Sequence, residues 1–251
     1  MKAQFKYAFR AGLPLRGATF AAILVLNLVF VVLGAFGLLP FAALVTAVSL
    51  SGTAIAVMMA MNIVSDIIIA RRMFSAPGAY LHALTPAPRR QILLSSSLAM
   101  LIMDFVTMAV AITGVVVLSL QLAGVYTEIN LWEAIQANTE ALYTLLMAAP
   151  LLTGYMLILM IILFCVSMRR SVFYNIPAGG LLTALLAIAI IYAVSLSLFI
   201  LAPFGVVTRF GLFFTISLGS LGIVMSALLF LVQAVVLFAL TAKLLERKVN
   251  I

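Results

Sequence analysis

Long apolar runs separated by short polar breaks dominate the pattern along this chain. Each run reaches the roughly 20 residues that a helix needs to cross the hydrocarbon core of a bilayer. The pattern therefore predicts one all-α, polytopic membrane domain over residues 1–251, with six transmembrane helices and no separate soluble domain. The predicted spans lie near residues 18–39, 41–70, 92–121, 141–168, 178–202 and 211–242.

The composition supports a membrane protein. Apolar residues make up 67% of the chain and charged residues 8%, and the mean hydropathy is +1.35. A soluble domain of this length carries about a quarter charged residues, so a folded soluble chain could not keep this much apolar surface from water. The single Cys165 lies inside an apolar run, which excludes an intramolecular disulfide and a paired-cysteine metal site.

The distribution of basic residues predicts the topology. With six spans and a cytoplasmic N-terminus, thirteen of the fourteen basic residues fall on the cytoplasmic side, and only Arg209 falls outside. This is the bias that orients bacterial membrane proteins, so both termini are expected in the cytoplasm. The net charge of +8 therefore needs no nucleic acid partner. The cytoplasmic set is Lys2, Lys6, Arg10, Arg16, Arg71, Arg72, Arg89, Arg90, Arg169, Arg170, Lys243, Arg247 and Lys248.

Residues 1–17 form a basic lead to the first span. Its apolar and basic residues each recur at every fourth position, which suits a helix lying on an anionic membrane surface. An ordinary charged flank is the alternative. Pro14 and Gly17 are expected to end this helix before the span, which is interpreted as a retained span and not as a signal peptide.

Two features concern the outer side and the fourth span. The loop near 123–140 carries only acidic charges, and Asn130 followed by Glu133 has the spacing of a helix cap. A short interfacial helix anchored by Trp132 is expected there, with an outer lid or entry surface as the alternative. Pro150 and Gly154 allow a kink or a re-entrant break in the fourth span.

The chain lacks the sequence signatures of enzymes. It has neither the glycine-rich loop ending in Gly-Lys-Ser/Thr that binds ATP phosphates nor a His-Glu-x-x-His helix. Its only histidine, His82, has no partner for metal or Ser-His chemistry. No catalytic residues, no metal ligands and no directly bound cofactor are therefore predicted.

Two carboxylates fall within the predicted spans. Asp104 follows Gln91 by thirteen residues, about 20 Å along a helix, where a charged side chain costs roughly 3 kcal/mol or more unless it is paired. It is a candidate for a cavity or an interface, although a protonated or hydrogen-bonded carboxyl group, joined to Thr107 or to a hydroxyl of a neighbouring span, is favoured. Asp66 is expected to form an ion pair at the cytoplasmic face with Arg71, Arg72 or a basic residue of a partner.

The segment from Arg71 to Leu98 joins the second and third spans. Its arginine pairs enclose Tyr80, His82 and three prolines. Arginines alone can serve to fix the topology, with the aromatic side chains lying among lipid headgroups. Apolar anchors rimmed by arginines also make a plausible docking surface for a soluble protein, and this second interpretation is favoured.

A family resemblance extends this interpretation. Tyr80-Leu81, a short spacer, and then Leu84-Thr85-Pro86-Ala87-Pro88-Arg89-Arg90-Gln91-Ile92-Leu93-Leu94-Ser95 resemble the first cytoplasmic loop of type-2 ABC exporter permeases, the six-span subunits of bacterial exporters. The ending Lys243–Asn250 is also similar to theirs. The sequence departs from many members at Thr85 and Ser96, where those have leucine and a basic residue.

The resemblance implies a set of partners and a location. It implies a coupling helix between spans 2 and 3 that contacts a soluble ABC ATPase subunit, present in two copies, with ATP and magnesium bound there. It also implies a second permease, identical or a paralogue, surrounding membrane lipid, and a place in the bacterial inner membrane. The expected contact residues are Phe74, Tyr80, Leu81, His82, Leu84, Arg89 and Arg90.

The expected function is therefore that of a permease subunit of an ATP-driven exporter, without an ATPase site of its own. The nearly uncharged spans point to an amphipathic or apolar substrate such as a peptide, drug or lipid-like molecule. Two alternatives stay open. One is an ATP-independent secondary transporter or channel that uses Asp104, and the other is a membrane scaffold or sensor subunit that transports nothing.

Overall fold

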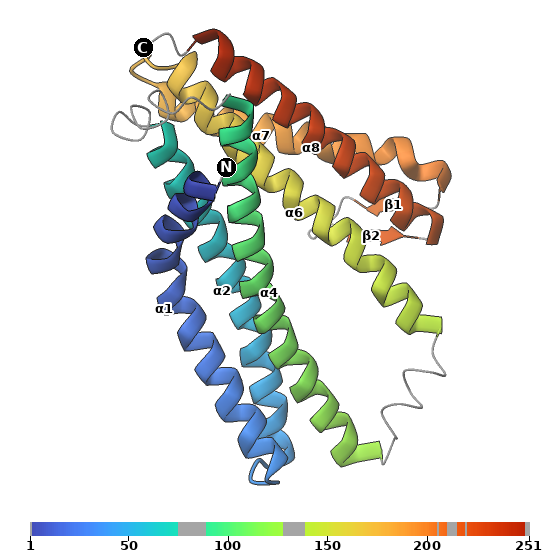
Figure 1. Ribbon diagram of the computed structural model, residues 1–251. Coiled ribbons are helices and arrows are strands. Elements are labelled where there is room, and N and C mark those ends of the chain that lie inside the picture. The colour runs from blue at the N-terminus through green and yellow to red at the C-terminus, as the bar shows by residue number, and fades with distance from the viewer. Residues whose placement is uncertain are drawn as a thin grey trace. The chain divides into compact units, whose positions relative to one another are not determined.

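The computed structural model describes residues 2–74, 89–127, 139–204, 206–209, 215–218 and 220–248. Within them the chain is almost entirely helical, and six helices are long and apolar enough to cross a membrane (Figure 1). The predicted class, a helical multi-pass membrane protein with six spans, is confirmed. The candidate spans are Arg16–Ala35, Phe41–Met73, Arg90–Ser119, Ala149–Ser171, Gly179–Leu201 and Leu221–Leu245.

The chain divides into two compact units. The first unit contains residues 1–69 and 94–138, and its three helices run side by side, with α2 antiparallel to α1 and α4 (Figure 1). These helices are α1 (Lys2–Ala35), α2 (Phe41–Phe74) and α4 (Arg89–Thr127).

A tight turn joins α1 to α2. Leu38 N–H donates to the carbonyl of Leu33 (3.0 Å), and Gly37 N–H donates to the carbonyl of Gly34 (3.0 Å). This pair of bonds is the Schellman arrangement, which needs a left-handed residue, and Gly37 supplies it with φ of 66°. Pro40 follows at once and cannot continue the helix, so the chain reverses within a few residues.

The helices of the first unit approach closely where one of them carries a glycine. Gly114 of α4 packs directly against the side chain of Asn27 on α1, and Gly34 of α1 packs against the amide of Gln121 on α4. Gln121 Nε2 also donates to the carbonyl of Val31 (3.0 Å). Small residues are typical of helix contacts in membranes, because association there depends on close packing and interhelical hydrogen bonds. About one helical turn before the Asn27–Gly114 contact, an apolar cluster of Ile23, Met58 and Ala111 is packed by Phe20, Ala54, Ile55 and Met108.

The expected break at the start of α1 is absent, so that prediction is wrong. The helix runs from Lys2 to Ala35 with Pro14 inside it and continues through Gly17. Proline removes one backbone donor and crowds the preceding turn, but helices of membrane proteins tolerate this where neighbouring groups compensate. The basic lead and the first span therefore form one helix.

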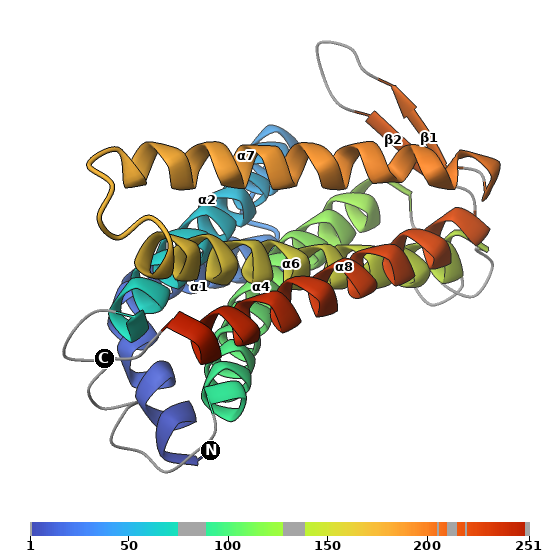
Figure 2. The ribbon, with the colours of Figure 1, turned by 90° about the horizontal axis from the view of Figure 1, so that it is seen from above.

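The second unit contains residues 70–93 and 139–251. Helix α8 packs along α6, and α7 also contacts α6 (Figure 2). Helix α6 runs through Pro150 without interruption, so the fourth span is not re-entrant. An apolar cluster forms between Leu198 and Leu201 of η1 and three residues of α8, Met225, Leu229 and Phe230. The helices are α6 (Thr139–Ser171), α7 (Gly179–Ser197), the 3-10 helix η1 (Leu198–Phe204) and α8 (Ser220–Lys248).

The predicted sixth span began too early. Strand β2 (Thr215–Leu218), which lies inside that predicted span, pairs antiparallel with β1 (Val206–Arg209), which precedes the span, and Val206 lies opposite Leu218. A continuous apolar run does not by itself distinguish a strand from a helix, and the β-branched residues in this segment favour a strand. Helix α8 begins only at Ser220.

Two predicted elements lie outside the described residues. The coupling helix between spans 2 and 3 falls on residues 75–88, and most of the outer helix anchored by Trp132 falls on residues 128–138. Both stay predictions.

Candidate functional site

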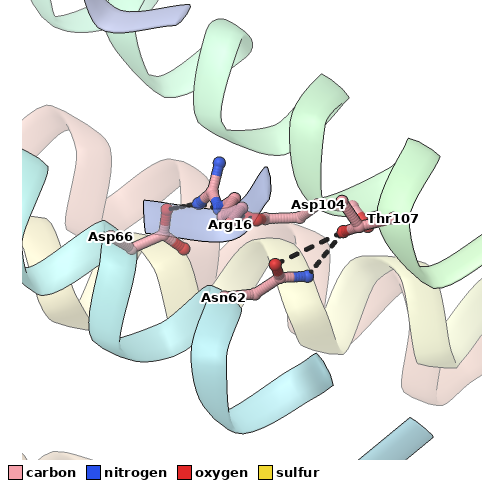
Figure 3. Close-up of polar contacts among 5 residues, drawn as sticks. All are labelled: Arg16, Asn62, Asp66, Asp104 and Thr107. Atoms are coloured by element: carbon pink, nitrogen blue, oxygen red, sulfur yellow. Dashed lines mark hydrogen bonds and ion pairs between the residues drawn. The ribbon is translucent and has the colours of Figure 1, made fainter. Parts of the chain in front are cut away.

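The strongest polar feature of the first unit is a buried cluster of three charged residues, one from each helix. Arg16 lies on α1, Asp66 on α2 and Asp104 on α4, and each is at most 2% exposed. The Nη2 atom of Arg16 contacts Oδ1 of Asp66 and lies 2.7 Å from Oδ1 of Asp104 (Figure 3). A single nitrogen atom therefore bridges two carboxyl groups, and the cluster connects α1, α2 and α4.

Two neutral side chains extend the cluster. Asn62 lies one helical turn before Asp66 on α2, and Thr107 lies three residues after Asp104 on α4. Asn62 Nδ2 donates to Thr107 Oγ1 (2.9 Å), and the Thr107 hydroxyl donates to the backbone carbonyl of Asp104 (3.0 Å; Figure 3). These bonds tie α2 to α4 next to the ion pairs and fix the helix turn that carries Asp104.

The charges of the cluster do not balance. One guanidinium and two carboxylates sum to one negative charge if all three groups are ionised. Transferring an ion from water to a buried site costs several kcal/mol even after relaxation, and only a matched partner compensates for this cost. Arg16 can match one carboxylate, so the second carboxylate carries a charge without compensation from the guanidinium.

Two residues of the cluster lie toward one end of their candidate spans. Asp66 precedes Arg71 by five residues, about 7.5 Å along the helix, and Arg71 is exposed. Arg16 is the first residue of its candidate span.

The structure gives both aspartates a partner that the sequence did not single out. Asp66 pairs with Arg16 of another helix, whereas Arg71 and Arg72 lie exposed on the last turn of α2. The hydroxyl group of Thr107 donates a hydrogen bond to the backbone carbonyl of Asp104. The carboxyl group of Asp104 is paired with Arg16. A buried carboxylate takes a buried cation as its partner because exposed arginines remain hydrated and gain little from pairing.

Arg16 is the site residue that sequence reasoning missed. It was counted with the positive flank that fixes the topology, like Arg10 before it. Its position offered a usable signal, because it directly precedes the first apolar run while the next two spans contain one aspartate each. A charge count across the first three spans would have suggested the pairing.

The expected ATPase contact residues lie mostly beyond the described part of the chain. Tyr80, Leu81, His82 and Leu84 fall outside it, as do the side chains of Phe74 and Arg89, although these two close α2 and open α4. Arg90 is described and exposed at the start of α4. The contact surface with a soluble partner thus stays a prediction.

No group of three or more His, Cys, Asp or Glu side chains with metal-binding geometry occurs among the residues that the structure describes. The two aspartates of the cluster share an arginine, whose positive charge opposes a metal cation at the same position.

Comparisons with models of known protein families, with curated proteins and with solved structures give no match for this chain. The functional argument therefore depends on the helices, the buried cluster and the sequence pattern. At the level that these observations support, the chain is a multi-pass membrane protein with six candidate transmembrane helices.

Proposed function

We propose that this protein is the membrane-spanning permease subunit of an ATP-driven ABC exporter in the bacterial inner membrane. The observation that carries the proposal is the set of six membrane-spanning helices, with a basic segment between the second and third. In the resembling permeases the same connection meets the ATPase. Since the sequence holds no phosphate-binding loop, the energy of ATP hydrolysis would come from a separate subunit.

In this proposal two permeases and two ATPase subunits form the working unit. Tyr80, Leu81 and Leu84 provide apolar anchors, and Arg89 and Arg90 provide a charged rim for the ATPase surface. ATP binding brings the ATPase subunits together and moves the attached connections. Helices α2 and α4 end and begin at this segment, so the movement passes directly into these two helices.

The spans indicate the class of substrate. Each candidate span contains at most two charged residues in its most apolar window, and two of those charges are already paired with Arg16. A route lined by apolar side chains fits an amphipathic or apolar molecule, such as a peptide, a drug or a lipid-like compound. It does not fit a small ion or a sugar, which need polar groups along the route.

Co-purification from membranes of the native host tests the proposal. The wild type is compared with a variant carrying Tyr80→Ala, Leu84→Ala and Arg89→Ala. The expected result is an ATP-hydrolysing protein that accompanies the wild type and is lost from the variant.

The matched control is Tyr174→Ala. Tyr174 is 72% exposed in the turn after α6, which falls on the same predicted side of the membrane. The control should retain the ATPase. If no ATP-hydrolysing protein accompanies the wild type, the exporter proposal is wrong. Equal loss from the control and the loop variant would refute the specific contact.

The buried cluster favours a second candidate, an ATP-independent transporter. Ionisable groups inside a membrane are a common mark of proton- or ion-coupled transport. This candidate predicts substrate uptake into liposomes that contain the purified chain alone, driven by a pH gradient, and a strong loss of uptake with Asp104→Asn. A scaffold or sensor subunit predicts partner binding without transport in either assay.

A further inference from the structure

We propose that Arg16 and Ser65 hold ordered water inside the first unit, beside the carboxyl groups of Asp66 and Asp104. The ligand of this site is a neutral molecule that accepts hydrogen bonds and has the size of water. The proposal goes beyond the exporter function and does not depend on it. It concerns hydrogen-bond donors that the ion pairs leave unused, and not the balance of charge in the cluster.

The guanidinium group of Arg16 has more donors than its ion pairs use. The side chain is 3% exposed, and the single atom Nη2 makes both contacts to the aspartates. Nε and Nη1 are buried and make no hydrogen bond to any residue that the structure describes. Part of the guanidinium points away from both aspartates (Figure 3). A buried charged donor without an acceptor is costly, so these atoms require a further partner.

A second unpartnered group lies next to the cluster. Ser65 directly precedes Asp66 on α2 and is 0% exposed, and its Oγ makes no hydrogen bond to a described residue. Elsewhere on the same helix, the hydroxyl groups of Thr46 and Ser49 donate to the carbonyl group four residues back. Ser65 lacks this bond. Because a hydroxyl group both donates and accepts, it can complete the hydrogen bonds of a molecule held by Arg16.

The surroundings restrict the ligand to a small neutral molecule. An anion would lie close to two carboxyl groups that already bind the same guanidinium, and like charges repel. On one side of the cluster Gly12 packs against Ile69 and Met103, one residue from each helix. On the other side lies the apolar cluster around Met58, which also has one buried residue from each helix. Water fits such a site, because buried water makes about three hydrogen bonds to polar groups that lack other partners.

Solid-state NMR with magnetisation transfer from water measures the site in the full chain in lipid bilayers. The chain has two aspartates, Asp66 and Asp104, so a sample isotopically labelled at aspartate alone reports on the cluster without further assignment. Cys165, the single cysteine, provides a buried reference in the second unit. It lies five residues before the exposed Arg170, and Asp66 lies five residues before the exposed Arg71. Magnetisation from water should build up several-fold faster on the aspartates than on the cysteine.

Two serine variants test the assignment to Ser65. Ser65→Ala removes one of the proposed partners of the water, so the transfer to the aspartates should slow. Ser51→Ala is the matched control, because Ser51 is also on α2 and 0% exposed, and its Oγ also has no partner among the described residues. It lies fourteen residues from Ser65, about 21 Å along the helix, so this variant should leave the transfer unchanged.

Two results would overturn the proposal. Equally slow transfer to the aspartates and to Cys165 in the wild type means that the cluster is dry, and this comparison needs no variant. Fast transfer that Ser65→Ala leaves unchanged, or that Ser51→Ala slows equally, means that Ser65 does not hold the water and that the site is wrongly assigned.

Discussion

The contact between Gly114 and Asn27 gives a prediction whose size follows from the geometry. A methyl group built on Gly114 would lie 2.8 Å from Cβ of Asn27 and overlap its amide group. Carbon atoms in ordinary contact are about 3.5–4.0 Å apart, so Gly114→Ala must push α1 away from α4. Overpacking of this kind costs about 1–3 kcal/mol. The same substitution gains about 1 kcal/mol of helix propensity, which hides part of that cost.

Gly52→Ala isolates the steric contribution. Gly52 lies in α2 and is exposed, with no atom within 4 Å of the position that its Cβ would take. It receives the same propensity gain without the clash. The free energy of unfolding of Gly114→Ala should therefore fall below that of Gly52→Ala by about 1–3 kcal/mol. Denaturation by SDS in mixed micelles, followed by tryptophan fluorescence, measures both variants.

A second substitution, Asn27→Ala, completes a double-mutant cycle with Gly114→Ala. Asn27 is 5% exposed, and neither atom of its amide group has a hydrogen-bond partner among the described residues. Asn27→Ala should therefore change the free energy of unfolding by less than about 1 kcal/mol, and it should restore stability to Gly114→Ala. Equal stability of the two glycine variants, or no rescue by Asn27→Ala, would refute the close packing of α1 on α4.

Further substitutions test the polar contacts by the same unfolding assay. Arg16→Met leaves two buried carboxyl groups without a cation, so the free energy of unfolding should fall by about 3–5 kcal/mol. Adding Asp66→Asn and Asp104→Asn should recover most of the loss, and a triple variant no more stable than Arg16→Met would contradict this. In the second unit, Gln233 Nε2 donates to Ser197 Oγ (2.7 Å), and Gln233→Leu should cost about 0.5–1.5 kcal/mol. Ser197→Ala should then add little to Gln233→Leu, whereas fully additive losses would count against the bond.

The spans could be predicted from the sequence because a membrane helix depends on local composition. Six long apolar runs are sufficient to identify six helices. The ends of the elements were less predictable. Pro14 does not end α1, and residues 206–209 and 215–218 pair as antiparallel strands, because neighbours in space decide whether a proline or an apolar run stays helical.

The site was only half predictable from the sequence. Asp66 and Asp104 stood out as rare charges in apolar runs, but their common partner Arg16 lies far from both in the sequence. Pairing between helices depends on which helix faces contact each other, and the sequence of a single helix does not show this. The same limit explains why the exposed Arg71 and Arg72 were expected as partners of Asp66, since they are its nearest cations in the sequence.

The short turn between α1 and α2 has a consequence for how the protein enters the membrane. Arg16 and Asp66 belong to two helices joined only by that turn, so the ribosome completes both before it makes Asp104. Each charge alone would cost roughly 3 kcal/mol at the centre of a helix inserting into lipid. As a hairpin, α1 and α2 can enter together with their opposite charges already matched. Asp104 is made afterwards and joins Arg16 when α4 packs against this hairpin.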